Sequence, residues 1–200
     1  MQLILVRHAL PERVESGNGV ADPRLTEQGE RQAARLVEAV GTGVEGLYSS
    51  PLRRARATTA PLAAALGREP DLVADLREYD SDADHYVPVH EMARVDPAGW
   101  DRIVAGLLPV GVDVAAFTAR VGAALEGIVA AHPGRGTVVV VAHAGVVNTW
   151  LAHLLGIDRP LAFPLDYTGL TRVVAGRDGR RAVRTVNEIA HVADLLGTPG

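Results

Sequence analysis

The 200-residue sequence contains no cysteine and no lysine, and each absence removes a class of chemistry. Without cysteine the chain has no disulfides, no thiolate metal ligands and no cysteine nucleophile. Without lysine it cannot form a phosphate-binding P-loop or a lysine Schiff base, because both need that side chain. All 20 Lys+Arg residues are therefore arginines, whose forked guanidinium groups bind phosphate and carboxylate.

Long hydrophobic runs and an excess of positive charge are also missing. The longest apolar stretch, residues 138–147, is too short and too polar to span a bilayer, and no signal-peptide pattern opens the sequence. The net charge of −4 argues against a general nucleic-acid-binding protein. We therefore expect a single cytoplasmic domain over residues 1–200, with no membrane or nucleic-acid partner.

Short aliphatic strands alternate with helical patterns along the chain. Thr26 is the expected N-cap of one helix, and Ser50 followed by Pro51 predicts the cap and first residue of the next. The alternation predicts an α/β fold, a three-layer α/β/α sandwich around a mostly parallel sheet. The predicted strands cover residues 2–7, 47–49, 71–76, 137–142, 169–175 and 181–187, and the predicted helices cover 27–40, 51–66, 112–131 and 146–155.

Residues 79–111 differ in character from the rest of the chain. They are acidic at first and are interrupted by prolines and glycines, which break regular helices. We interpret this segment as a cap inserted within the domain, placed to close over a ligand.

Two predicted strands run directly into a histidine, at Arg7-His8-Ala9 and at His143-Ala144-Gly145. In open α/β sheets, ligands bind at the carboxyl ends of the strands. We therefore expect His8 and His143 to face each other across one pocket. The small residues that follow each histidine allow the backbone N–H groups to approach a ligand closely.

Arginines and carboxylates complete a set of groups suited to phosphoryl transfer. The stretch SSPLRRARATT (49–59) places three arginines in the first turns of a helix, where the helix N-terminus already favours an anion. The stretch DLREYDSD (75–82) follows a predicted strand with several carboxylates. Histidine can attack phosphorus, arginines can bind the phosphoryl oxygens, and a carboxylic acid can protonate the leaving oxygen. Such chemistry requires no metal and no other cofactor.

Four motifs, which occur in the family's order along the chain, resemble those of the histidine phosphatase superfamily, in its phosphoglycerate mutase-like branch. The family's Arg-His-Gly motif corresponds to Arg7-His8-Ala9, and its second histidine motif to residues 141–145. The family's LTExG element is present at residues 25–29, and its SSPLxRAxxT element at residues 49–58. Each motif alone is weak evidence, but the ordered set covers nearly the whole chain.

The resemblance implies a role for each site residue. His8 would be the phosphorylated nucleophile, and Glu78 would be the proton donor. Three residues compete with Glu78 for the donor role: Asp75, Asp80 and Asp82. The phosphate-binding set would be Arg7, Arg54, His143 and the backbone of Ala144.

Departures from the family pattern bear on the reaction. In the mutases, serine and asparagine lie three and six residues after the nucleophile, whereas this chain has Pro11 and Val14, which favours hydrolysis. Ala9 replaces the family glycine and narrows the allowed backbone conformations.

The favoured interpretation is a metal-independent phosphomonoesterase that hydrolyses a small phosphorylated metabolite through phosphohistidine. A mutase-type phosphotransferase, a catalytically silent phosphate-binding module and a metal-dependent hydrolase with His8 and His143 as ligands remain alternatives. The sequence leaves the oligomeric state open, a homodimer being a common outcome for such domains.

Overall fold

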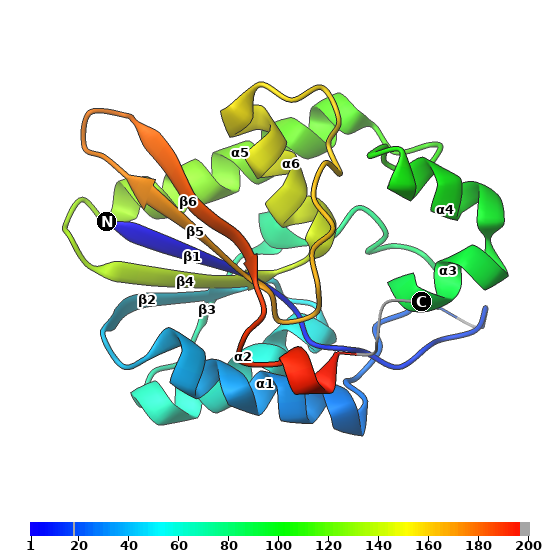
Figure 1. The fold of residues 1–200 in the computed structure, drawn as a ribbon, viewed down its shortest axis with the longest axis horizontal. Coiled ribbons are helices and arrows are strands. Elements are labelled where there is room, and N and C mark those ends of the chain that lie inside the picture. The colour runs from blue at the N-terminus through cyan, green and yellow to red at the C-terminus, as the bar shows by residue number, and fades with distance from the viewer. Residues whose placement is uncertain (18, 197–200) are drawn as a thin grey trace.

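A computed structural model describes residues 1–17 and 19–196 and contains one six-stranded sheet in the order β3-β2-β4-β1-β5-β6 (Figure 1). The strands are β1 (Gln2–Arg7), β2 (Val44–Ser49), β3 (Asp71–Leu72), β4 (Thr137–Ala142), β5 (Leu170–Ala175) and β6 (Arg181–Glu188). The α-helices are α1 (Glu27–Val40), α2 (Arg53–Leu66), α3 (Val89–Val95), α4 (Pro97–Val104), α5 (Val114–Ala131) and α6 (Ala144–Leu155). Two short 3₁₀ turns cover Ala74–Leu76 and Ala193–Leu195.

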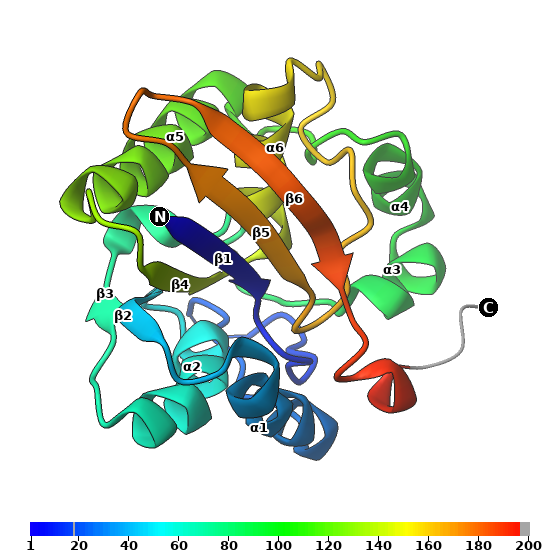
Figure 2. The ribbon, with the colours of Figure 1, turned by 60° about the vertical axis from the view of Figure 1, so that its left-hand side comes forward.

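The sheet is mixed. Strands β3, β2, β4 and β1 are parallel to one another, and β5 pairs antiparallel with both of its neighbours, β1 and β6. Helices α1 and α2 cover one face, and α5 and α6 cover the other, as the two ribbon views show (Figures 1 and 2). This arrangement confirms the predicted three-layer α/β/α sandwich.

The central strand β1 explains why the sequence opens with an aliphatic run. Leu3 and Leu5 enter the apolar cluster beneath α5 and α6, whereas Ile4 and Val6 enter the cluster beneath α1 and α2. Successive strand side chains point to opposite faces, so a strand covered on both faces needs apolar residues at every position. All four side chains are at most 1% exposed.

Helix α5 is long and apolar enough to cross a membrane by length and composition. In this fold one face of the helix packs on the sheet, and 28% of its residues are buried. Phe117, Val121, Leu125 and Ile128 recur at helical spacing, are buried and pack in the cluster beneath α5 and α6.

Several predicted element boundaries are wrong: β2 begins at Val44 rather than Leu47, and α6 begins at Ala144 rather than Val146. Helix α2 begins at Arg53 rather than at Pro51, so its N-cap residue is Leu52 and not Ser50, and the Ser50 hydroxyl contacts the His143 imidazole. The carboxylate of Asp22 accepts a hydrogen bond from the Arg53 N–H at 2.8 Å instead. The strand predicted over residues 71–76 ends at Leu72, after which a 3₁₀ turn carries Leu76 into the core.

The Thr26 cap was predicted correctly: its hydroxyl accepts a hydrogen bond from the Gly29 N–H at 2.9 Å. Gly29 is required there, because a Cβ would lie 2.1 Å from the Leu10 carbonyl oxygen. The first turn of α1 thus packs directly on the backbone that follows β1.

Segment 79–111 contains α3 and α4, which lie beyond the carboxyl ends of β1 and β4 (Figure 1). Within the described chain, neither helix contributes a buried residue. The segment therefore lies on the side of the sheet where the two histidines end their strands.

Candidate active site

The two histidines lie side by side because their strands are neighbours in register. Arg7 of β1 pairs with Ala142 of β4, and the His8 N–H donates to the Ala142 carbonyl oxygen at 2.9 Å. The rings of His8 and His143 lie 5.1 Å apart between centroids. Both residues are at most 3% exposed. The strand ends thus bring together the two histidines that the sequence pointed to.

His8 presents a free ring nitrogen. Its Nδ1 lies 2.8 Å from the Ala9 carbonyl oxygen. Because a carbonyl only accepts, Nδ1 carries the proton and Nε2 carries the lone pair. Burial, reinforced by the positive charges of Arg54 and Arg7, lowers the pKa of His8 well below 6.5. His8 is therefore neutral at neutral pH, the protonation state that a nitrogen nucleophile needs.

The Ser50 hydroxyl can set the opposite proton arrangement on His143. The Ser50 hydroxyl lies 2.8 Å from Nε2 of His143 and accepts a hydrogen bond from the Leu52 N–H at 3.4 Å. Its own proton is then free to be donated to Nε2, which leaves the ring proton on Nδ1. That Nδ1 is buried and has no partner in the described part of the chain. It can therefore donate to an oxyanion held between the histidines.

Arg7 and Arg54 reach the same site from two elements. Arg7 ends β1, and Arg54 lies in the first turn of α2, with exposed fractions of 6% and 1%. Neither Nε finds a hydrogen-bond partner among residues 1–17 and 19–196. Buried N–H groups are rarely left unpaired, so these two donors are available to an anion.

The remaining sequence candidates are placed less centrally. Arg53 and Arg56 are exposed on α2. Ala144 is the first residue of α6, where backbone N–H groups have no intrahelical partner. Ala9 is buried, and the described non-glycine residues with positive φ are Thr168 and Asn187 only, so alanine fits without strain. Its N–H donates to the Thr58 hydroxyl at 2.9 Å.

Glu78 is buried and held by two backbone N–H groups. Its carboxylate accepts from Gly145 at 2.8 Å and from Tyr79 at 3.2 Å. Burial, together with the nearby charge of Asp80, raises the pKa of Glu78 from 4.5 to about 7. At neutral pH this carboxyl exchanges a proton readily, as a general acid must. A Cβ on Gly145 would lie 2.3 Å from Glu78 Oε1, so glycine is needed there.

The three competing carboxylates differ from Glu78 in their surroundings. Asp75 and Asp82 are exposed. Asp80 pairs with the Arg54 guanidinium at 3.3 Å, and its side chain is 32% exposed. Asp80 is therefore a counter-ion of Arg54, and Glu78 is the buried carboxyl beside the second histidine motif.

Glu78 should make stability depend on pH. Its folded pKa lies above its unfolded value of 4.5, so the folded state binds more protons and stability falls as pH rises from about 4.5 through about 7. Glu78→Gln removes this loss. Relative to wild type, we expect the variant to gain roughly 3 kcal/mol of unfolding free energy between acidic and alkaline pH. Urea unfolding across this range measures it, and parallel curves for the two proteins would contradict it.

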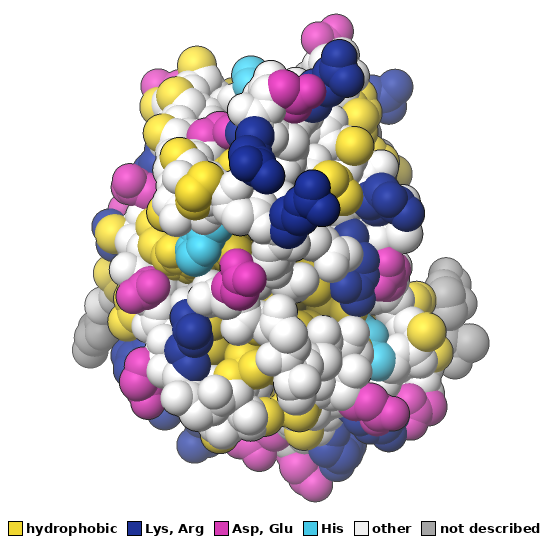
Figure 3. Space-filling view, turned by 90° about the vertical axis from the view of Figure 1, so that its left-hand side faces the viewer, with side chains coloured by type: hydrophobic (Ala, Val, Ile, Leu, Met, Phe, Trp, Pro, Cys, Tyr) yellow, Lys and Arg dark blue, Asp and Glu magenta, His cyan; other side chains and the backbone are white. Residues whose placement is uncertain are grey.

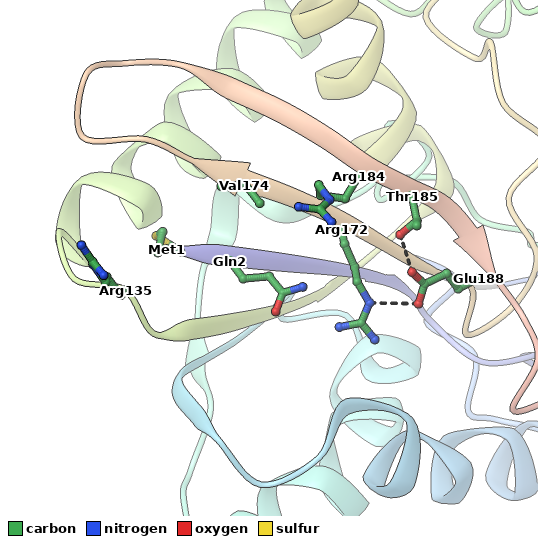
Figure 4. A pocket seen from close by; sticks show the side chains of 8 residues that line it. All are labelled: Met1, Gln2, Arg135, Arg172, Val174, Arg184, Thr185 and Glu188. Atoms are coloured by element: carbon green, nitrogen blue, oxygen red, sulfur yellow. Dashed lines mark hydrogen bonds and ion pairs between the residues drawn. The ribbon is translucent and has the colours of Figure 1, made fainter.

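A cavity of about 420 Å³ is lined by Glu78, Tyr79, Arg120 and the start of α5. A larger, more open one of about 610 Å³ lies at the other end of β1 and contains none of the predicted site residues (Figure 4). Figure 3 views the side carrying the N-terminus and the β5–β6 hairpin, where arginine side chains are scattered among acidic ones. Arg172 in the larger cavity is already paired with Glu188 at 2.9 Å.

Ser50 is the site residue whose role the sequence did not reveal. The local pattern of serine before proline indicated a helix cap, and nothing local signals a bond to a histidine 93 positions away.

Comparisons with known proteins identify the family of the chain. The family model described as "Histidine phosphatase superfamily (branch 1)" matches residues 3–188. Phosphoserine phosphatase 1 of Hydrogenobacter thermophilus is 32% identical, over 98% of this chain and 96% of that protein.

Solved structures show the same fold. A mycobacterial glucosyl-3-phosphoglycerate phosphatase with inorganic phosphate has a TM-score of 0.75 at 23% identity, covering 96% of this chain and 99% of that one. The Entamoeba histolytica phosphoserine phosphatase with 3-phosphoglyceric acid has a TM-score of 0.74 at 23% identity, covering 96% and 98%. The family model thus covers nearly the whole chain, and the paired histidines lie at the strand ends. The chain therefore belongs to branch 1 of the histidine phosphatase superfamily and is a phosphatase.

Proposed function

We propose that the protein is a metal-independent phosphomonoesterase that hydrolyses a small phosphorylated metabolite through a phosphohistidine on His8. The observation that carries this proposal is the set of buried nitrogens without a partner that surrounds His8 in the described part of the chain. His8 offers a free Nε2, while Arg7, Arg54 and His143 offer unpartnered donors to the phosphoryl oxygens.

The reaction proceeds in two displacements. Nε2 of His8 attacks phosphorus, the bond to the leaving oxygen breaks, and Glu78 transfers its proton to that oxygen. Glu78 then takes a proton from water, whose oxygen attacks the phosphohistidine. The phosphorus–nitrogen bond breaks, and inorganic phosphate leaves. Donors already in place for the developing charge stabilise both transition states.

Two observations support hydrolysis without a metal. Among residues 1–17 and 19–196, no three His, Asp or Glu side chains gather as metal ligands. The positive charge at the site comes from guanidinium groups.

Pro11 and Val14 stand where the mutases carry polar side chains. Pro11 forms a backbone bridge with Leu25, and Val14 forms one with Tyr86.

The relative from Hydrogenobacter thermophilus makes O-phosphoserine the first substrate to test. In this proposal, segment 79–111 is a cap that closes over the leaving group, because it lies beyond the strand ends that carry His8 and His143. A cap of this length restricts the site to small phosphate esters.

Phosphate release from p-nitrophenyl phosphate and from O-phosphoserine, in excess EDTA, tests the proposal. Sustained release with the chelator supports it. Loss of release on chelation that zinc or magnesium restores would favour the metal-dependent alternative. Transfer of the phosphoryl group between positions of a substrate, without free phosphate, would favour a mutase. Binding without either reaction would favour the silent module.

Ser50→Ala should lower kcat about 10-fold, because His143 loses the group that fixes its proton on Nδ1. Steady-state kinetics on p-nitrophenyl phosphate measure the effect. Ser49→Ala is the matched control, since that neighbouring buried hydroxyl donates to the Ser50 carbonyl oxygen at 2.9 Å and not to the histidine. Equal losses in the two variants would show that Ser50 acts on packing alone.

A further inference from the structure

The guanidinium carbons of both site arginines lie over aromatic rings. The guanidinium carbon of Arg7 lies 3.9 Å from the ring centroid of Tyr167. That of Arg54 lies 4.8 Å from the ring centroid of Tyr86. The two tyrosines are 7% and 8% exposed, so each contact is shielded from water. Cation–π attraction is strongest in such desolvated surroundings.

Carboxylates neutralise these two buried cations only in part. Arg54 has an ion pair with Asp80, at 3.3 Å. Arg7 has no ion pair within the described residues and donates to the Leu165 carbonyl oxygen. A buried cation without compensation is costly, so the ring faces supply a stabilisation that the acidic residues do not.

A ring face and a carboxylate stabilise a guanidinium group in different ways. The N–H bonds lie in the guanidinium plane and point to its edge, where phosphoryl oxygens bind. A carboxylate would occupy those N–H groups and cancel the charge that attracts phosphate. An aromatic ring brings no negative charge to compete for those N–H groups, and the Nε–H of both Arg7 and Arg54 remains unpartnered among the described residues.

We propose that Tyr86 and Tyr167 are positioning residues, which hold Arg54 and Arg7 through their ring faces and so orient both cations for the phosphoryl oxygens. This inference rests on the proposed function. Neither tyrosine belongs to the motifs that reveal the family, and the sequence did not place either ring against an arginine.

Hydrogen bonds to other segments of the chain hold both tyrosines in place. Tyr86 exchanges two hydrogen bonds with Val14, at 2.8 and 3.0 Å. The Tyr167 hydroxyl accepts from the N–H of Val89, the first residue of α3, at 3.2 Å. The next residue, Thr168, has φ of 59° and donates its N–H to the Arg7 carbonyl oxygen at 3.0 Å. The two rings therefore join segment 79–111 to the two arginines.

A graded series at position 86 tests the proposal. Tyr86 is replaced by phenylalanine and by mono-, di- and trifluorophenylalanine, which keep the ring shape while weakening its negative face, and also by leucine. Calorimetry gives the Kd of inorganic phosphate, and kinetics give kcat/KM. We expect the Kd of phosphate for Tyr86→Phe to stay within about 2-fold of the wild-type value. Phosphate affinity should then fall stepwise with each added fluorine, and trifluorophenylalanine and leucine should weaken it about 10-fold.

Phosphate affinity that is unchanged across the fluorinated series would overturn the proposal, because a ring that only fills space does not respond to its electron density. Failure of the wild type to bind phosphate would overturn it too. Phosphate binding that follows the series in a protein that hydrolyses no ester would sink the proposed function and leave this inference standing.

Two further variants separate ring loss from other effects. Tyr48→Leu is the matched control, since that ring packs against His132 away from the site, and phosphate affinity should not change. Tyr167→Phe keeps the ring over Arg7 and removes only the acceptor for Val89. It should keep phosphate affinity within about 2-fold of wild type, and a loss as large as that of Tyr86→Leu would contradict the role given to the Tyr167 ring.

Discussion

Replacing His8 by alanine should abolish phosphate release, with a fall in kcat of about 10³-fold or more. The expectation follows from the structure because the Nδ1 contact of His8 with the Ala9 carbonyl leaves its Nε2 unprotonated, while the Nε2 of His143 is occupied by the Ser50 hydroxyl. Rapid quenching of wild type with ³²P-labelled substrate should trap a phosphoryl group that is stable to alkali and labile to acid. The alanine variant should trap none.

Controls for this experiment come from the same fold. His153→Ala removes an exposed histidine on α6 and should leave both turnover and trapping unchanged. Inorganic phosphate should still bind the His8→Ala protein, because Arg7, Arg54 and His143 are intact. Label found on His143 instead of His8 would reverse the two histidine assignments.

Replacing Glu78 by glutamine should give the second-largest effect, and its size should depend on the leaving group. An alkyl phosphate such as O-phosphoserine needs a proton on the leaving oxygen, so kcat should fall about 10²-fold or more. p-Nitrophenolate leaves without help, so its release in the first turnover should fall less than about 10-fold, whereas water attack on the phosphohistidine, where Glu78 is the base, should slow for both esters. A comparison of the two esters in wild type and variant measures the difference.

The pH profile gives an independent reading of the same carboxyl. Only the protonated acid can donate, and the pKa of Glu78 is raised from 4.5 to about 7. Turnover of the alkyl ester by wild type should therefore decline above about pH 7, and the glutamine variant should lack this decline. The same behaviour in Asp80→Asn, with Glu78→Gln unaffected, would move the donor to Asp80.

Much of the fold and half of the site follow from local sequence patterns. Residues 2–7 and 137–142 are aliphatic runs that end in histidine, and parallel strands present their carboxyl ends together. His8 and His143 could therefore be paired before any coordinates. Arg7 follows by adjacency, since it immediately precedes His8.

The rest depends on contacts between segments far apart in the sequence. Glu78 could not be separated from Asp75, Asp80 and Asp82 by pattern, because the N–H of Gly145 selects it. The serine–proline signal placed the start of α2 at Pro51, two residues too early, and gave no sign of the contact between the Ser50 hydroxyl and the distant His143 imidazole. Local propensities describe single segments, whereas these choices are made when two segments meet.

The pairing of β1 with β4 sets the scale of the site. Neighbouring strands lie about 4.8 Å apart. The ring centroids of His8 and His143, which directly follow the two strands, lie 5.1 Å apart. The spacing of the two histidines that would hold a phosphoryl group in the proposed reaction thus follows from the main-chain hydrogen bonding between β1 and β4. Loops elsewhere can lengthen or shorten without changing that spacing, so new substrates can be accommodated at segment 79–111 while the reaction centre stays the same size.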